Sequence, residues 1–82
     1  MKLYLVWSSV YEEADIEAIF DNLEEAKQFV YKNWRKFEFR VLVEERPLGT
    51  PSYSKTLYRA EILGYYEDEK ELKVEQDWAN EG

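Results

Sequence analysis

The sequence predicts an α+β domain of two layers, in which one helix packs on one face of a mainly antiparallel sheet. One segment carries apolar residues at the three- and four-residue spacing of a helix, and several short segments alternate apolar with polar residues as strands do. Their order is β-β-α-β-β, with a weaker fifth segment as a candidate edge strand. At 82 residues the chain is long enough for one small core, so we expect a single domain over residues 1–79 and a frayed tail over 80–82.

The clearest element is the helix, expected over residues 23–36. Its apolar positions fall on one stripe, formed by Leu23, Ala26, Val30, Trp34 and Phe37. Asn22 is a favourable N-cap residue, and Glu25 stands three positions later, where a capping box places its acidic partner. We therefore expect the stripe to face the core, with Trp34 largely buried at its centre.

Two strands are expected before the helix. Residues 2–10 carry apolar side chains on both alternating faces, which suits a central strand. Residues 11–15 are polar and acidic and are expected to form a loop. Residues 16–20 follow as a short strand, with Ile16, Ala18 and Phe20 on one face. The two strands are close enough in sequence to pair as an antiparallel hairpin, although the usual Asn-Gly turn is absent.

Two further strands are expected after the helix, over residues 39–46 and 55–63. The loop between them, residues 47–54, holds both prolines. The C-terminal part has two interpretations, a turn followed by a weak edge strand over residues 71–76, or a short helix over residues 67–78. Periodicity does not decide between them.

The first half of the chain also follows a pattern of short motifs. These are a strand, an acidic Tyr-bearing segment, a short strand that ends in Phe and a helix start, namely Lys2-Leu3-Tyr4-Leu5-Val6-Trp7, Tyr11-Glu12-Glu13, Ala18-Ile19-Phe20 and Glu24-Glu25-Ala26. In this pattern the chain resembles small uncharacterised bacterial and phage domains of unknown function, which often have Gly where Ala18 stands. The resemblance implies the β-β-α-β-β fold and a bacterial or phage host, and it implies no catalytic residue.

Composition excludes several classes of chemistry. The chain contains no His and no Cys, which excludes imidazole general bases, Ser-His-Asp triads, disulfides and thiolate zinc sites. The clustered acids lack both the spacing of a calcium loop and the apolar walls that raise a carboxyl pKa. We expect a non-enzymatic protein with no catalytic residue, no cofactor and no metal ion. Because the apolar runs are far shorter than a membrane span and no signal-peptide pattern is present, we expect a cytoplasmic location.

The formal charge of −7 is unevenly distributed along the chain. Residues 12–25 hold seven acidic and no basic side chains, residues 26–66 hold eight basic against four acidic ones, and residues 67–82 hold seven acidic against two basic ones. The net negative charge disfavours direct nucleic-acid binding. The acidic blocks have two interpretations, as solvated faces that keep the protein soluble or as a surface that docks on a basic groove of another protein.

The chain has 3 Trp, 7 Tyr and 4 Phe, more aromatic residues than a core of this size can bury. We expect the core to contain Trp7, Phe20, Phe29, Trp34, Phe37 and Phe39. The candidates for the surface are Tyr31, Tyr53, Tyr65, Tyr66 and Trp78, which either cover the rim of the sheet or form an interface. A separate interpretation makes Tyr31, between Lys27 and Arg35, a platform on which nucleic-acid bases stack.

These observations predict an acidic protein-binding module, of the kind that a phage or mobile element uses as an inhibitor to occlude a basic surface of a host nuclease or defence protein. The expected partner-binding residues are Tyr11, Glu12, Glu13, Asp15, Glu17 and Tyr53. The alternative is a structural module that forms a homodimer through a sheet patch left uncovered by the helix, around Tyr4, Val6, Tyr58 and Ile62. A small enzyme that uses carboxylates alone is the third hypothesis.

Overall fold

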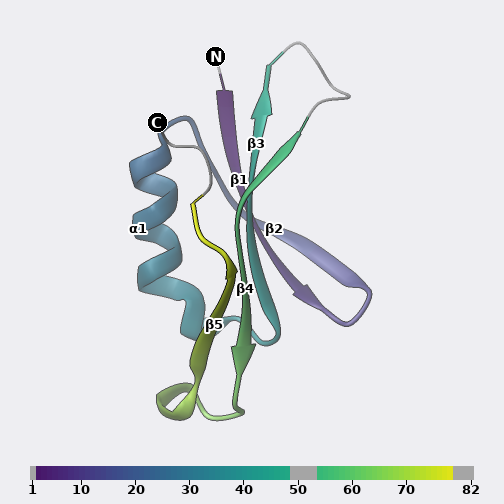
Figure 1. Cartoon of the computed structure of the whole chain (residues 1–82), viewed down its shortest axis with the longest axis vertical. Helices are drawn as coiled ribbons and strands as arrows, with labels where there is room; N and C mark the ends of the chain where they lie inside the picture. Colours follow the sequence, from purple (N-terminus) through teal and green to yellow (C-terminus); the bar gives the residue numbers. More distant parts are fainter. Residues whose placement is uncertain (1, 49–53, 79–82) are drawn as a thin grey trace.

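The computed structural model describes residues 2–48 and 54–78 of the chain. Within these residues it contains one α-helix and one sheet of five antiparallel strands in the order β2-β1-β3-β4-β5 (Figure 1). The elements along the chain are β1 (Lys2–Val10), β2 (Glu13–Phe20), α1 (Leu23–Asn33), the 3₁₀ turn η1 (Trp34–Lys36), β3 (Arg40–Pro47), β4 (Lys55–Leu63), the 3₁₀ turn η2 (Glu67–Glu69) and β5 (Glu71–Gln76). The predicted α+β class, with one helix and a mainly antiparallel sheet, is confirmed.

The core is one cluster of apolar side chains that the sheet shares with α1. Val6, Val43 and Tyr58 lie opposite one another across β1, β3 and β4, and all three are fully buried. Val30 of α1 belongs to the same cluster. Because alternate residues of a strand point to opposite faces, these strand residues mark the sheet face that α1 contacts. The other buried members are Ala26, Trp34, Phe37, Val41, Ala60 and Ile62.

This core overturns the expected exposed patch around Tyr4, Val6, Tyr58 and Ile62. Val6, Tyr58 and Ile62 are buried members of the cluster, and Tyr4 packs against it. The expectation was wrong because β1 and β4 have apolar residues on both faces, and periodicity alone does not show which set the helix covers. The other set of β1 includes Trp7, which we expected in the core and which instead lies half-buried on the opposite face.

The local sequence explains where α1 begins and ends. The side-chain oxygen of Asn22 accepts a hydrogen bond from the backbone N–H of Glu25 at 3.2 Å, which satisfies one of the free N–H groups at the helix start. The α-helix ends at Asn33, and η1 continues it as a tighter turn, so the expected helix over residues 23–36 is divided into two segments. This turn brings Trp34 and Phe37 into the core, where each is 9 % exposed.

The hairpin between β1 and β2 is longer than the sequence indicated. β2 begins at Glu13, and only Tyr11 and Glu12 connect the two strands, so the expected loop over residues 11–15 is wrong. Tyr11 has a positive φ of 57°, a conformation that Gly or Asn normally supplies in a tight hairpin. The turn therefore forms without the usual Asn-Gly sequence.

A β-bulge in the same hairpin changes which side chains share a face. Val6 pairs with Ala18 and Trp7 with Ile16, which leaves Glu17 as the extra residue. Ile16 therefore lies on the face opposite Ala18, and the expectation that both point the same way is wrong.

The C-terminal part forms an edge strand, as one of the two interpretations predicted. β5 pairs with β4. The alternative prediction of a short helix over residues 67–78 is wrong, because the helical part of this segment is limited to the 3₁₀ turn η2. Gly is required at position 64, because its φ of 103° is disfavoured for residues with a side chain and a Cβ there would lie 3.1 Å from the backbone oxygen of Glu69. Lys70 Nζ donates to the carbonyl oxygens of Arg35 and Phe37, at 2.8 and 2.7 Å, and so links this turn to the end of the helix. Most of the expected loop over residues 47–54 and the expected tail over 80–82 lie outside the described residues.

Trp78 closes one edge of the core. Its ring stacks on Tyr58 with the centroids 4.5 Å apart, and its Nε1 donates a hydrogen bond to the Tyr31 hydroxyl at 2.7 Å. Lys27 Nζ lies 5.3 Å from the centre of the same ring. One interpretation of the sequence made Tyr31, between Lys27 and Arg35, a platform for nucleic-acid bases. In the structure both Tyr31 and Lys27 lie against Trp78.

Replacing Trp34 with Ala is expected to lower the free energy of unfolding by about 3–5 kcal/mol, because it leaves a cavity between the helix and the sheet. A small domain has only about 5–10 kcal/mol of stability, so the variant is expected to be partly unfolded. Urea unfolding followed by circular dichroism measures the difference. A cooperative transition at nearly the same urea concentration as wild type would show that Trp34 is not central to the core.

Tyr58 is expected to make stability depend on alkaline pH. Burial, together with the nearby Tyr31 and Asp77, raises the pKa of Tyr58 to about 12, and its hydroxyl has no hydrogen-bond partner among the described residues. Between about pH 10 and about pH 12 the unfolded chain releases this proton while the folded chain keeps it, so the free energy of unfolding falls as the pH rises.

The variant Tyr58→Phe isolates this effect. Because the hydroxyl is unpaired, we expect the variant to be within about 1 kcal/mol of wild type at neutral pH. It should lose less stability than wild type above about pH 10. Urea unfolding of both proteins at neutral pH and at about pH 11 makes the comparison, and an identical loss in the two proteins would contradict the assignment to Tyr58.

Candidate functional site

Five of the six expected partner-binding residues lie on the β1–β2 hairpin, whose closed end extends away from α1 (Figure 1). Glu12 is in the turn, and Glu13, Asp15 and Glu17 follow along β2, all of them exposed. We call these four residues the acidic hairpin. The sixth expected residue, Tyr53, lies outside the described residues.

Three carboxylates of the acidic hairpin point to the same face. Glu13 pairs with Val10 and Asp15 with Ser8, and these positions alternate in step along the two strands. Glu17 accepts a hydrogen bond from the Ser8 hydroxyl at 2.5 Å, which holds its carboxylate on that face too. None of the acidic hairpin residues forms an ion pair with another described residue. Their negative charge is therefore uncompensated within the described part of the chain.

Tyr11 is at the tip of this hairpin and is 87 % exposed. Its φ of 57° is in the left-handed region, where a residue with a β-carbon is disfavoured by roughly 1–2 kcal/mol. Its ring contacts Phe39, with the centroids 4.8 Å apart. An aromatic side chain thus stands at a turn position that Gly fills more readily, and strain of this kind is often found at binding sites.

A groove of about 560 Å³ adjoins the hairpin tip. Its aromatic and aliphatic side chains come from three segments that are distant in the sequence, and we call the set Tyr11, Phe39, Leu63 and Tyr65 the aromatic groove. All four are exposed, Tyr65 to 96 %. Lys36, Lys70, Glu38 and Glu61 also line it, so its apolar lining is bordered by charges of both signs.

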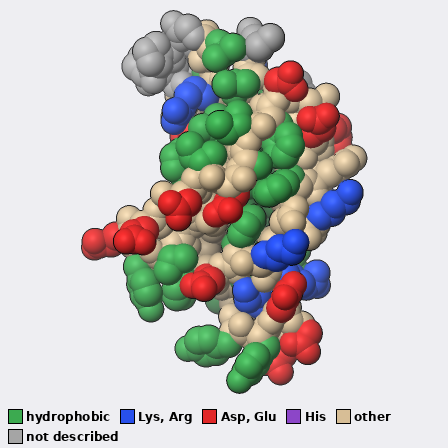
Figure 2. Space-filling model, turned by 180° about the vertical axis from the view of Figure 1, so that it is seen from behind, with side chains coloured by type: hydrophobic (Ala, Val, Ile, Leu, Met, Phe, Trp, Pro, Cys, Tyr) green, Lys and Arg blue, Asp and Glu red, His purple; other side chains and the backbone are tan. Residues whose placement is uncertain are grey.

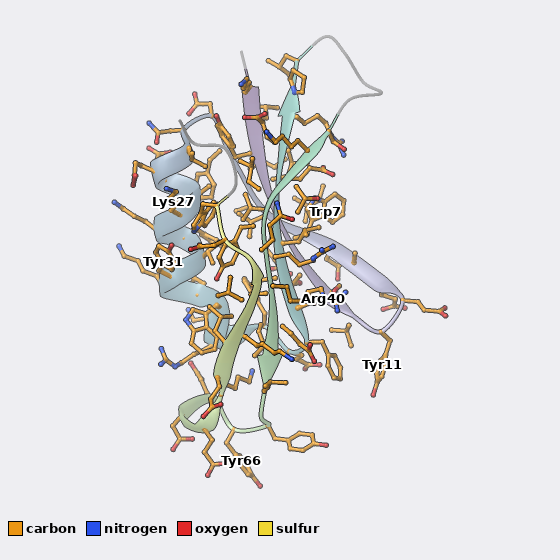
Figure 3. The ribbon with its side chains drawn as sticks, viewed as in Figure 1. Trp7, Tyr11, Lys27, Tyr31, Arg40 and Tyr66 are labelled. Carbon is orange, nitrogen blue, oxygen red and sulfur yellow. The ribbon has the colours of Figure 1, made fainter. Side chains whose placement is uncertain are left out.

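The figures show how these features adjoin. In Figure 2, which views the molecule from behind, acidic side chains occupy a projection at one side, and hydrophobic side chains lie directly below them. In Figure 3, Tyr11 lies at the end of the hairpin, and Tyr66, 70 % exposed, lies at the neighbouring turn between β4 and β5. Negative charge and exposed aromatic groups are therefore gathered at one end of the molecule.

Sequence reasoning missed Phe39 as a surface residue. We expected it in the core because it extends the alternation that buries Val41 and Val43, but it is 42 % exposed. β3 begins only at Arg40, so the alternation of that strand does not include Phe39. The dense group of apolar and aromatic residues around Gly64 was the available signal for the other side of the groove, and the predicted exposure of Tyr65 and Tyr66 is confirmed.

In the part of the chain that the structure describes, no group of three or more His, Cys, Asp or Glu side chains is placed to hold a metal ion. No helix within residues 2–48 and 54–78 is both long and apolar enough to cross a membrane. Comparisons of the chain with protein-family models, with curated proteins and with solved structures find no match. A functional assignment therefore rests on the geometry of the acidic hairpin and the aromatic groove.

The turn geometry predicts that two small residues at position 11, Gly and Ala, differ in their effect on stability. Tyr11→Gly and Tyr11→Ala both remove the ring and its contact with Phe39, but only Gly adopts a φ near 57° without a steric cost. We expect the Gly variant to be about 1 kcal/mol more stable than the Ala variant. Urea unfolding measures the difference, and an Ala variant as stable as the Gly variant would contradict the left-handed turn.

Proposed function

We propose that the protein is a non-enzymatic binding module that docks the acidic hairpin and the aromatic groove on a basic surface of a partner protein. The observation that carries this proposal is the contact between Tyr11 and Phe39, with ring centroids 4.8 Å apart. Since Tyr11 is at the hairpin tip and also lines the groove, the two features form one continuous surface. Exposed aromatic groups beside unpaired charges are a composition that protein interfaces use.

The two parts of this surface have different roles in the proposal. The carboxylates of the acidic hairpin attract and orient a basic partner, chiefly by raising the rate of association. Tyr11 and Tyr65 are 87 % and 96 % exposed, so they can bury a large side-chain area when a partner binds. In the proposal they act as anchors at the centre of the interface. In a two-layer arrangement with the helix on one sheet face, neither side chain is needed for the core.

The partner we propose is a protein whose basic surface normally receives nucleic acid, such as a host nuclease or defence protein. A chain with a charge of −7 is repelled by phosphate and attracted by the surfaces that bind phosphate. Occlusion of such a surface in the cytoplasm is the proposed mode of action, and a phage or mobile element is the proposed source.

A homodimer is the second candidate, and the exposed apolar residues of β2 favour it. Ile16 and Ile19 are 46 % and 55 % exposed, and they pair with Trp7 and Leu5 on the sheet face away from α1. However, β2 also carries most of the acidic hairpin, so two copies that meet along this strand bring like charges together. For this reason docking on a basic partner is the stronger proposal.

Neutralising three of the four carboxylates of the acidic hairpin is expected to remove partner binding without unfolding the protein. The variant Glu12→Gln, Glu13→Gln, Asp15→Asn leaves Glu17 and its hydrogen bond to Ser8 in place. The three changed side chains are exposed and unpaired, so we expect the free energy of unfolding to change by less than about 1 kcal/mol. Affinity capture from a bacterial lysate, followed by mass spectrometry, identifies proteins that wild type retains and the variant does not. Affinity for such a protein is expected to fall as salt is raised.

The matched control is Asp21→Asn, Glu24→Gln, Glu25→Gln, which removes the same charge from the start of α1. These residues are also exposed, and they lie away from the hairpin tip. We expect the control to retain the partner that the hairpin variant loses. If both variants retain it, or if both lose it equally, the acidic hairpin is a solubility feature and the proposal fails.

A further inference from the structure

A second hollow lies on the sheet face away from α1. Trp7, Leu42 and Arg59 lie opposite one another across β1, β3 and β4, and Ser9 pairs with Arg40 two residues further along. These side chains surround a hollow of about 230 Å³. In Figure 3, Trp7 and Arg40 are on the side of the sheet away from α1.

Two guanidinium groups line this hollow, and none of its described lining residues carries a carboxylate. Arg59 forms no ion pair with any residue that the structure describes. Arg40 Nε lies 3.7 Å from Glu75 Oε1, a long pair at the protein surface. Two Arg side chains without an acid among the lining residues are a local exception in a chain of charge −7. The guanidinium group is planar, and its N–H groups match the oxygens of a carboxylate or a phosphate.

Neutral groups complete the hollow. The hydroxyl-bearing side chains of Ser9 and Thr56 contribute to its lining, and Trp7 and Leu42 supply apolar surface. The indole Nε1 of Trp7 is buried and has no hydrogen-bond partner among the described residues, whereas a buried polar group normally has one. The hollow therefore combines positive charge, hydroxyl groups and a flat aromatic surface.

We propose that this hollow binds a carboxylate or phosphate group through Arg40 and Arg59, and that an aromatic anion such as benzoate also packs its ring on Trp7. A volume of about 230 Å³ is smaller than the roughly 300–1,000 Å³ of sites for drug-sized ligands, so the occupant is a small molecule or one acidic side chain. A carboxylate can come from a free anion or from the acidic hairpin of a second copy. This site does not depend on the proposed docking of the hairpin and the groove.

Two carboxylates next to the hollow are expected to affect anion binding. Glu75 pairs with Arg40, and Glu61 lies opposite Arg40 on β4. A bound anion has to compete with Glu75 for the Arg40 guanidinium. Removing the charge of Glu75 is therefore expected to tighten anion binding, an effect that a purely structural role for Arg40 does not produce.

The test is a titration with sodium benzoate, observed through the indole N–H signals in ¹⁵N NMR spectra at constant ionic strength. We expect benzoate to shift the Trp7 signal at concentrations up to tens of millimolar and to leave the Trp34 signal in place, whereas the uncharged benzamide has little effect. Arg59→Gln is expected to weaken benzoate binding about tenfold, and Glu75→Gln to tighten it about threefold. The matched control, Lys32→Gln, removes a positive charge from the exposed surface of α1 and is expected to change affinity by less than about twofold.

Sedimentation velocity over a range of protein concentrations distinguishes the two sources of the carboxylate. A protein that stays monomeric and binds benzoate assigns the site to a free anion. Self-association that benzoate reverses and Arg59→Gln weakens assigns it to a second copy. If benzoate and benzamide shift the Trp7 signal equally, if Arg59→Gln binds like wild type, or if benzoate leaves the Trp7 signal unchanged, the site is refuted.

Discussion

The rest of the structure depends on one buried cluster that joins Val30 of α1 to the core row, which is Val6, Val43 and Tyr58. These residues come from one helix and from the three central strands, and they are fully buried. Among the described residues there is one α-helix, of 11 residues, for a five-stranded sheet, so it can cover only part of the sheet surface. Most of the buried apolar side chains among the described residues belong to this one cluster, and burial of apolar surface is the main favourable term in folding.

The proposed binding roles rest on features that this core does not use. The acidic hairpin continues past the helix-covered area and carries carboxylates without ion pairs in the described structure. Tyr11, Phe39, Leu63 and Tyr65 remain exposed at the same end of the molecule. On the face away from α1, two Arg side chains and an indole with an unpaired N–H surround a separate hollow. Surfaces of opposite charge thus lie on one small domain, and they suit different occupants.

Much of the fold followed from periodicity. The stripe and the N-cap predicted the helix from Asn22 onward, and the alternation over residues 55–63 predicted the bounds of β4. In other segments the apolar pattern was compatible with more than one structure. β1 is apolar on both faces, so the sequence could not show whether Val6 or Trp7 meets the helix. The tight turn was not predictable either, because Tyr11 occupies a conformation that its side chain disfavours.

The candidate site was partly predictable, for a related reason. The acidic hairpin is contiguous in sequence, and its dense negative charge identified it directly. The aromatic groove is assembled from segments around residues 11, 39 and 64, which only the sheet pairing brings together. The hollow lined by Arg40 and Arg59 depends likewise on cross-strand register, and a one-residue shift would place one of them on the other face.

Amide hydrogen exchange tests most directly whether the fold rests on the core row while the hairpin remains free to bind. The account predicts that the amide protons of Val6, Val43 and Tyr58 exchange only through global unfolding, with an exchange free energy equal to the free energy of unfolding. It predicts much faster exchange for residues 12–15 at the hairpin end, through local opening. Protection of residues 12–15 equal to that of the three central strands would contradict the account, because the hairpin would then be part of the cooperative core.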